Sequence, residues 1–139
     1  MRLNNAHCAL ALSLATVATL SAAQGTAYVT SEKDDALTLI DTKTLAAKGT
    51  LPTCKRGRHV QRQPDAKIMV ACTDSNAADV IDPASGKSVR RVPLGDEPEA
   101  FDVSPDGKTI YVSNEDEAEA SFIDAESGKK LKAIKVGKE

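Results

Sequence analysis

The segment SPDGKTIYVSN, which runs from Ser104 to Asn114, decides the fold that this sequence predicts. Residues 105–108 (PDGK) have the composition of a tight hairpin turn, in which the glycine can adopt a positive φ. Residues 109–113 (TIYVS) alternate in the way that strands do and are rich in β-branched and aromatic side chains. The segment therefore predicts a hairpin turn followed by a strand of an antiparallel sheet.

The residues on either side complete a unit of four strands. Residues 100–104 form the strand before the turn, residues 120–124 follow an acidic loop, and residues 131–136 follow a turn at residues 127–129. Outside the N-terminal segment, no stretch keeps apolar residues at a spacing of about 3.6 for three turns. We therefore expect strands and tight turns throughout the folded part.

This unit is repeated along the chain with a period of 41 or 42 residues. Four antiparallel strands in a period of about 40 to 45 residues are typical of a β-propeller blade, whose faces can be buried only against neighbouring blades. The sequence therefore predicts an all-β fold, a β-propeller with four-stranded antiparallel blades, in units 26–57, 58–98 and 99–139. The recurring residues are Tyr28-Val29, Met69-Val70 and Tyr111-Val112, and Ile40-Asp41, Ile81-Asp82 and Ile123-Asp124.

These units are too few to close a ring. We call the four strands of a unit its first to fourth strand types, in chain order. The first unit begins at Tyr28 on a strand of the second type, so it has three strands, and each of the other two units has four. Closed propellers have roughly four to eight blades, whereas this chain supplies about two and three-quarters. We therefore expect an open arc, either the N-terminal portion of a longer propeller or a shortened gene product. The remaining blades, or self-assembly of several copies, are needed to close it.

The first 23 residues predict a secretory signal peptide. Arg2 supplies a positive charge, Cys8–Leu20 is an apolar run, and residues 21–23 (SAA) allow cleavage after Ala23. The apolar run is shorter than the roughly 20 residues of a transmembrane helix. We expect a periplasmic or secreted protein with no membrane span after cleavage, in which residues 24–139 form the partial propeller.

The charge balance argues against a nucleic-acid partner. The 18 Lys and Arg residues face 20 Asp and Glu residues, which gives a formal net charge of −2. Nucleic-acid-binding domains usually carry a basic excess. Two Tyr, two Phe and no Trp also leave little to stack on bases.

One segment between two units is strongly basic, and its counterpart one unit later is acidic. Residues 54–62 (CKRGRHVQR) carry four cations and no acid, whereas residues 95–101 (GDEPEAF) carry three acids and no base. Each joins the fourth strand of one unit to the first strand of the next, so both lie on the same rim of a propeller. One hypothesis is an anion-binding or partner-docking rim, and the alternative is charge pairing between blades, worth about 0–1 kcal/mol where exposed. The residues of this rim are Arg56, Arg58, His59, Glu97 and Glu99, and the pairs would join Arg58 or Arg62 to Glu97 or Glu99.

Two cysteines remain after removal of the signal peptide, Cys54 and Cys72. In an oxidising compartment they form either a disulfide or two buried thiols. Cys54 precedes the innermost strand of its blade and Cys72 lies near the end of the neighbouring strand, so antiparallel pairing places both at the same rim. A disulfide there would contribute about 3 kcal/mol in the chain-entropy model.

Few residues predict catalysis or metal binding, and we assign no catalytic residue and no metal ligand. His59 is the only histidine after the signal peptide, so it is the one candidate base, and we expect it to be hydrogen-bonded at the rim. Glu115–Glu119 lacks the spacing of an EF-hand loop, so a solvated acidic loop is expected. Asp41, Asp82 and Asp124 are expected to accept backbone hydrogen bonds from the turns that follow them.

Three stretches resemble the YVTN-type propeller repeats, whose pattern is SPDGK-x-x-YV-[ST]-N followed by V-x-x-ID. They are residues 27–31 (AYVTS), 104–114 and 122–124 (FID). The turn of residues 63–67 departs from this pattern, because Ala66 stands where the turn glycine is expected. If that position needs a positive φ, the alanine costs about 1 kcal/mol.

The wider sequence resembles the periplasmic propeller proteins associated with PQQ-dependent alcohol catabolism. The resemblance includes residues 52–60 (PTCKRGRHV) and 111–119 (YVSNEDEAE) and extends over residues 26–137. It implies that this chain is the N-terminal portion of a propeller linked to PQQ only through its pathway, with no cofactor of its own. It also implies a periplasmic quinoprotein dehydrogenase or cytochrome as the partner.

Three functions are compatible with these features. The first is an exported, non-enzymatic propeller that binds or scaffolds a component of PQQ-dependent alcohol oxidation. The second is a channel-based propeller enzyme, a lactonase or a quinoprotein oxidoreductase, whose site lies in blades outside this chain. The third is a surface adhesion or structural repeat protein. We favour the first, because no catalytic constellation is present and Trp, with which quinoprotein propellers sandwich PQQ, is absent.

Overall fold

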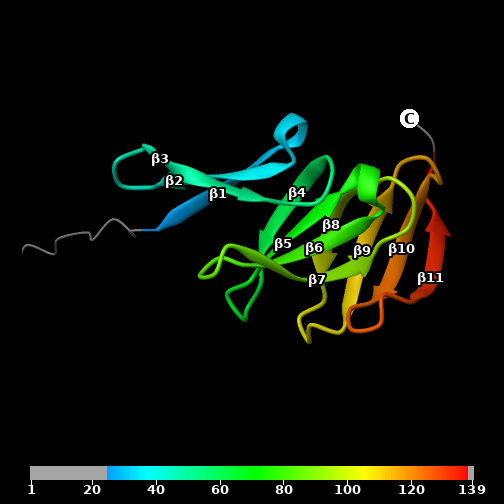
Figure 1. Ribbon diagram of the computed structural model, residues 1–139. Coiled ribbons are helices and arrows are strands. Elements are labelled where there is room, and N and C mark those ends of the chain that lie inside the picture. Colours follow the sequence, from blue (N-terminus) through cyan, green and yellow to red (C-terminus); the bar gives the residue numbers. More distant parts are fainter. Residues whose placement is uncertain (1–24, 138–139) are drawn as a thin grey trace, which may run out of the picture.

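The computed structural model describes residues 25–137, so the predicted signal peptide lies outside the described residues. The described chain forms three antiparallel sheets that follow one another along the sequence (Figure 1). The first sheet contains β1 (Thr26–Ser31), β2 (Ala36–Asp41) and β3 (Ala47–Pro52). The second contains β4 (Gly57–Arg62), β5 (Ile68–Cys72), β6 (Ala77–Asp82) and β7 (Lys87–Pro93). The third contains β8 (Pro98–Val103), β9 (Thr109–Asn114), β10 (Glu119–Asp124) and β11 (Lys130–Lys135).

The helical segments within residues 25–137 are two short 3-10 turns, η1 (Glu32–Asp34) and η2 (Thr73–Ser75). Neither is long and apolar enough to cross a membrane. The expectation of strands and tight turns is therefore confirmed for the described part of the chain.

The backbone repeats with the same period as the sequence. The turns between the third and fourth strand types hold Leu45, Gly86 and Gly128, with φ of 58°, 68° and 71°. The hairpins between the first and second strand types hold Ala66 and Gly107, with φ of 68° and 72°. Ala66 thus adopts a left-handed conformation that costs a residue with a Cβ about 1 kcal/mol.

The inner edges of the sheets are formed by β4 and β8. Each is the edge strand of its four-stranded sheet. β4 contacts β1 of the first sheet, and β8 contacts β4 and β5 of the second. β1 has the same place in the repeat as β5 and β9. In the described residues it lies at the edge of the first sheet, because no strand equivalent to β4 and β8 pairs with it there.

Two apolar cores join the three sheets. Side chains alternate between the faces of a strand, so Ile68 and Val70 of β5 face the first sheet, whereas Met69 and Ala71 face the third. These residues are all at most 4% exposed. The core between the first and second sheets also contains Leu37, Cys54, Cys72 and Ile81, and the core between the second and third also contains Ala78, Val80, Val92, Leu94, Phe101, Ile110, Val112, Ile123 and Ala125.

A carboxylate closes the turn after the third strand type of every sheet, as predicted. Asp41 Oδ1 accepts hydrogen bonds from the backbone N–H groups of Lys43 and Thr44, both at 2.9 Å. Asp82 and Asp124 accept equivalent bonds at 3.0 and 2.7 Å. Hydrogen bonds lower the pKa of all three carboxyl groups, chiefly from the Thr44 backbone at Asp41 and from a serine hydroxyl at the other two.

The inner strands begin closer to the rim than expected. β4 starts at Gly57 and β8 at Pro98, because pairing with β5 and β9 continues to the ends of these strands. Arg58, His59 and Glu99 consequently lie on strands, which corrects their placement in joining loops.

Candidate functional site: a charged rim

The predicted site residues lie at the upper end of the sheets in Figure 1, where the loops after β1, β3, β5, β7 and β9 gather. Arg56 and Glu97 are in loops, and Arg58, His59 and Glu99 begin the inner strands. We call this end the charged rim, comprising residues 32–35, 53–59, 73–76, 94–99 and 115–119.

Arg56 and Glu97 occupy equivalent places on the charged rim, 41 residues apart. Both have a left-handed backbone, with φ of 56° and 40°. The N–H of Arg56 donates to Asp35 Oδ1 at 2.8 Å, and the N–H of Glu97 donates to Asn76 Oδ1 at 3.2 Å. A side chain from a loop of the preceding sheet therefore fixes the backbone of each of these two charged residues.

Both rim arginines are paired with carboxylates. Arg56 Nε lies 3.5 Å from Glu32 Oε2, and its Nη1 lies 3.4 Å from Asp74 Oδ1. Arg58 Nη2 lies 2.5 Å from Glu99 Oε2, and its Nε lies 3.6 Å from Glu32 Oε1. Glu32, Arg58 and Glu99 belong to three successive sheets, so this chain of ion pairs crosses both sheet interfaces. An anion would have to displace these carboxylates, which disfavours the anion-binding hypothesis for this rim.

Carboxylates crowd together on the third-sheet side of the charged rim. Repulsion from Asp116 is the main cause that raises the pKa of Glu97, with burial and the charge of Glu115 adding to it. Burial raises the pKa of Glu99, and the attraction of Arg58 partly offsets this. Oε1 of Glu99 is buried without a hydrogen-bond partner within the described chain.

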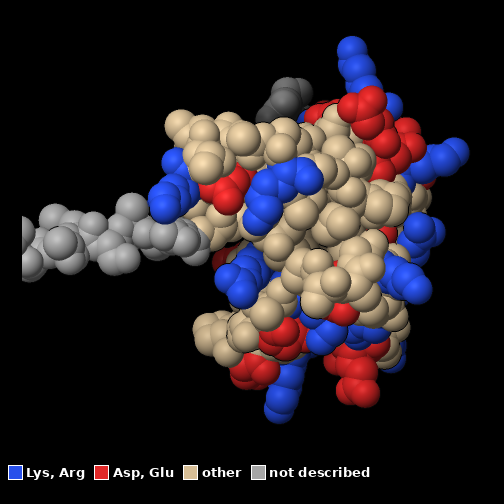
Figure 2. Space-filling model, turned by 60° about the vertical axis from the view of Figure 1, so that its left-hand side comes forward, with Lys and Arg blue, Asp and Glu red and all other residues tan. Residues whose placement is uncertain are grey.

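A cleft of about 620 Å³ opens beside these carboxylates. Its lining contains four carboxylates and one cation, so a positive group is favoured there. Figure 2 shows acidic side chains gathered at the upper end of the molecule. The charged residues that line the cleft are Arg58, Glu99, Glu115, Asp116 and Glu119.

His59 contacts the aromatic ring of Phe101 on the next inner strand. The ring centroids are 4.9 Å apart and the planes are inclined by 74°. The hydrogen bond that we expected for His59 is not formed within residues 25–137. The imidazole instead makes an edge-on ring contact between the second and third sheets.

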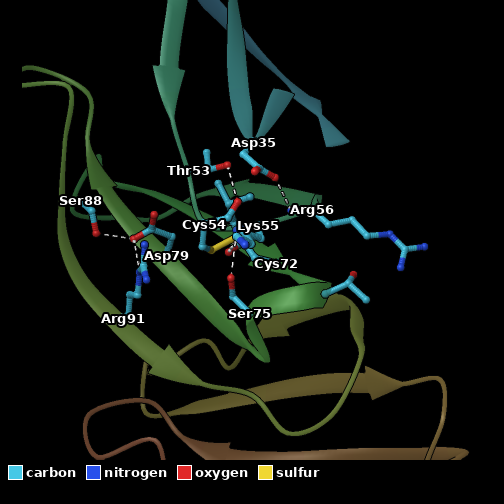
Figure 3. The surroundings of a disulfide bond; sticks show 12 residues. Asp35, Thr53, Cys54, Lys55, Arg56, Cys72, Ser75, Asp79, Ser88 and Arg91 are labelled. Atoms are coloured by element: carbon cyan, nitrogen blue, oxygen red, sulfur yellow. Dashed lines mark hydrogen bonds and ion pairs between the residues drawn. A yellow bond between two sulfur atoms is a disulfide. The ribbon is translucent and has the colours of Figure 1, made fainter. Parts of the chain in front are cut away.

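Cys54 and Cys72 form a disulfide just inside the charged rim (Figure 3). Their Cα atoms are 5.7 Å apart, and the two residues are 2% and 0% exposed. The N–H of Lys55 donates to Ser75 Oγ at 2.9 Å. The segment that leads to Arg56 is thus tied to the end of β5 by a covalent bond and to η2 by a hydrogen bond.

The acidic turn after β9 is partly neutralised by lysines of β11. Lys130 Nζ lies 3.0 Å from Glu117 and 3.4 Å from Glu119, and Lys135 Nζ lies 3.0 Å from Glu119. In the described part of the chain, no three His, Cys, Asp or Glu residues are grouped so as to hold a metal ion.

Sequence reasoning named Glu99 as a possible partner of Arg58, but it missed Glu32 and Asp74, the other acidic partners of the rim arginines. Glu32, Asp74 and Asp116 are spaced by 42 residues and occupy the same turn after the second strand type. The repeat that predicted the strands therefore also contained the signal for these acids.

A buried carboxylate on β6 was also missed. Asp79 is 1% exposed, bonds the hydroxyl of Ser88 and lies 3.8 Å from Arg91 Nε (Figure 3). All three residues lie on the adjacent strands β6 and β7, so the carboxylate is satisfied within its own sheet.

Known structures share this arrangement of sheets. No protein-family model matches the chain, and no curated protein matches it. The chain is similar to hydrazine synthase from Kuenenia stuttgartiensis, with 22% identity and a TM-score of 0.68 over 81% of this chain and 33% of that one. It is similar to virginiamycin B lyase from Staphylococcus aureus, with 18% identity and a TM-score of 0.63 over 81% and 38%. It is also similar to AztD from Citrobacter koseri, with 22% identity and a TM-score of 0.58 over 76% and 31%.

These proteins are β-propellers. The fold of this chain is that of a β-propeller. The prediction of four-stranded antiparallel blades is confirmed, with three blades described and the first of them three-stranded. At these identities the similarity establishes the fold alone, and the chain spans about a third of the length of the solved structures it matches.

Proposed function

We propose that this chain is part of an exported, non-enzymatic β-propeller that docks a basic protein partner at the charged rim. The distribution of charge on the charged rim is the observation that supports this proposal. Arg56 and Arg58 are already paired, whereas Glu97 is repelled by Asp116 and Glu115. A cation from a partner would relieve that repulsion, so the rim favours basic surfaces.

The sequence resemblance supports the choice of partner. The YVTN-type segment 104–114 and the wider likeness to periplasmic propellers of PQQ-dependent alcohol catabolism favour a periplasmic quinoprotein dehydrogenase or its cytochrome. In this proposal the dehydrogenase holds PQQ, and the propeller binds or scaffolds it. Residues 1–23 would direct export.

Biolayer interferometry with the dehydrogenase and the cytochrome from the native host tests the proposal. We expect saturable binding that weakens about tenfold when salt screens exposed charges. The double variant Glu97→Gln/Asp116→Asn should weaken it about fivefold or more, because it removes two of the crowded carboxylates. Glu126→Gln removes an exposed carboxylate from the opposite end and serves as the matched control.

Absence of binding to either protein would contradict the proposal, and so would binding that the rim variant leaves unchanged. Free PQQ, lactones and alcohols should be tested in parallel. Turnover of any of them by the chain would favour the channel-based enzyme instead.

A further inference from the structure

The two interfaces between the three blades are built from the same positions of the repeat. At each interface, apolar residues of one blade, which we call its forward set, meet apolar residues of the blade that follows, which we call its backward set. The forward sets are Tyr28, Leu39 and Leu51 in the first blade and Met69, Val80 and Val92 in the second, 41 residues apart. The backward sets are Ile68, Val70 and Ile81 in the second blade and Ile110, Val112 and Ile123 in the third, 42 residues apart.

The third blade has a forward set that no blade of the described chain covers. Its members are Tyr111, Phe122 and Ile134, which follow the forward set of the second blade by 42 residues. Tyr111 and Phe122 are paired across β9 and β10, and their rings are in edge-on contact with centroids 5.3 Å apart. Tyr111 and Ile134 are 41% and 44% exposed, whereas the equivalent Met69 is 4% exposed. An apolar face that is buried on the second blade is therefore open on the third.

The first blade has a backward set that is open in the same way. Its members are Ala27, Val29 and Ile40, which precede the backward set of the second blade by 41 residues. Ala27 and Ile40 are paired across β1 and β2, and Val29 is 47% exposed, whereas the equivalent Val70 is 0% exposed. The first and third blades lie at opposite ends of the row of sheets (Figure 1). One copy of the chain thus presents both halves of a blade interface, one at each end.

The side chains of these two open sets match in size. Phe122 is larger than Val80, its equivalent in the second blade, and Ala27 is smaller than Ile68, its equivalent there. Because close-packed interfaces tolerate neither voids nor added volume, a bulky forward set requires a backward set with small residues. The first blade of this chain supplies such a set, and the second and third blades do not.

We infer that a second copy of this chain covers the open faces, with the first blade of each copy packed head to tail on the third blade of the other. Each copy contributes three blades, so two copies supply six. This number is within the range of roughly four to eight blades at which propellers close, whereas three copies would supply nine. A head-to-tail contact that closes on itself gives a finite ring. The interface is therefore that of a closed dimer.

Sedimentation velocity of the purified full chain at about 1–100 µM tests the inference. We expect a species of twice the mass of the chain. Val29→Asp and Ile134→Asp should each weaken dimerisation about tenfold or more, because each places a carboxylate in the apolar interface. Both side chains are largely exposed within one copy, so the variants should fold, and thermal unfolding of their monomers verifies this.

Val89→Asp is the matched control. Val89 lies on β7, the outer edge strand of the second blade, and is 52% exposed. It belongs to neither set, so the same chemical change there should leave dimerisation unchanged.

A mixture of the two interface variants distinguishes head-to-tail packing from pairing of like faces. Val29→Asp keeps an unmodified third blade and Ile134→Asp keeps an unmodified first blade. One unmodified interface can therefore form between the two variants, and none can form within either variant alone. We expect the mixture to dimerise more tightly than each variant by itself.

A chain that stays monomeric at about 100 µM would overturn the inference and leave the open faces to further blades of a longer propeller. Assemblies larger than a dimer would contradict ring closure by two copies. The inference is also wrong if Val29→Asp has no effect, if Val89→Asp weakens dimerisation as much as the interface variants, or if mixing restores nothing. None of the residues in the two sets lines the cleft at the charged rim, so failure to dimerise would leave the proposed docking function untouched.

Discussion

Ala66 and Gly107 occupy the same place in two hairpin turns, and both have a left-handed backbone, with φ of 68° and 72°. Glycine adopts this conformation without strain, whereas a Cβ contacts the neighbouring carbonyl. The turn of residues 63–67 therefore keeps the blade geometry at an energetic cost that the turn of residues 104–108 avoids.

Replacing Ala66 by glycine should raise the free energy of unfolding by about 1 kcal/mol, because it removes this strain. Gly107→Ala should lower it by a similar amount, and no atom lies within 4 Å of the added Cβ to confuse the comparison. Urea denaturation measures both changes. A destabilised Ala66→Gly variant would show that the turn is not strained.

The carboxylates of Asp82 and Asp124 make stability depend on pH. Turn hydrogen bonds lower their folded-state pKa below the ordinary value of 3.8. Their contribution is therefore complete above the unfolded-state pKa and is lost as the pH falls through the folded-state pKa. We expect the Tm to drop as the pH is lowered from about 6 to about 2. Asp82→Asn should lower the Tm at neutral pH and reduce this drop, and an unchanged profile would refute the assignment.

At the scale of elements, the second and third blades hold their rim loops by different chemistry at equivalent positions. Cys54 corresponds to Gly95 and Cys72 to Asn114, at spacings of 41 and 42 residues. Asn114 Nδ2 donates to two carbonyls of residues 94–96, at 3.0 and 2.7 Å. Gly95 is needed there, since its φ is 85° and a Cβ would lie 3.0 Å from the Asn114 amide. Buried hydrogen bonds therefore replace the disulfide.

Removal of the disulfide should lower the free energy of unfolding by about 3 kcal/mol, because the bond restricts the unfolded chain. The variant Cys54→Ala/Cys72→Ala tests this by urea denaturation. Reduction of the unmodified chain with dithiothreitol is the control and should cause a similar loss. If reduction has no effect while the alanine variant is unstable, the cysteines stabilise by packing and not through the bond.

At the scale of the whole molecule, adjacent blades are joined by apolar cores and by ion pairs across the rim. The pair between Arg58 and Glu99 joins the second and third blades, and its side chains are only 30% and 20% exposed. Partial burial strengthens the attraction but also costs desolvation, so the net gain is modest.

A double-mutant cycle with Arg58→Gln and Glu99→Gln should give a coupling energy of about 1 kcal/mol. Arg58→Gln leaves the Glu99 carboxylate without its cation, and Glu99→Gln leaves Arg58 paired with Glu32 alone, whereas the double variant removes both charges of the pair. Urea denaturation of the four proteins measures the coupling. A coupling energy near zero would mean that this ion pair does not help to hold the second and third blades together.

The strands, the turns and the Asp41, Asp82 and Asp124 bonds could all be predicted because they depend on residues close together in sequence. Alternation sets the two faces of each strand, and the turn residues set the hairpins. The period of 41 or 42 residues then determined, from the sequence by itself, a propeller of four-stranded blades.

Only the tertiary structure decided which charges meet. Arg58 contacts Glu32 and Glu99, and Gln61 contacts Asp102, across boundaries between blades. The sequence left open whether the basic segment binds anions or pairs with acids of the next blade, and packing of the blades pairs its rim arginines with acids. The physical reason is that an ion pair or a cleft depends on distances between side chains of different sheets, and those distances exist only once the blades have packed.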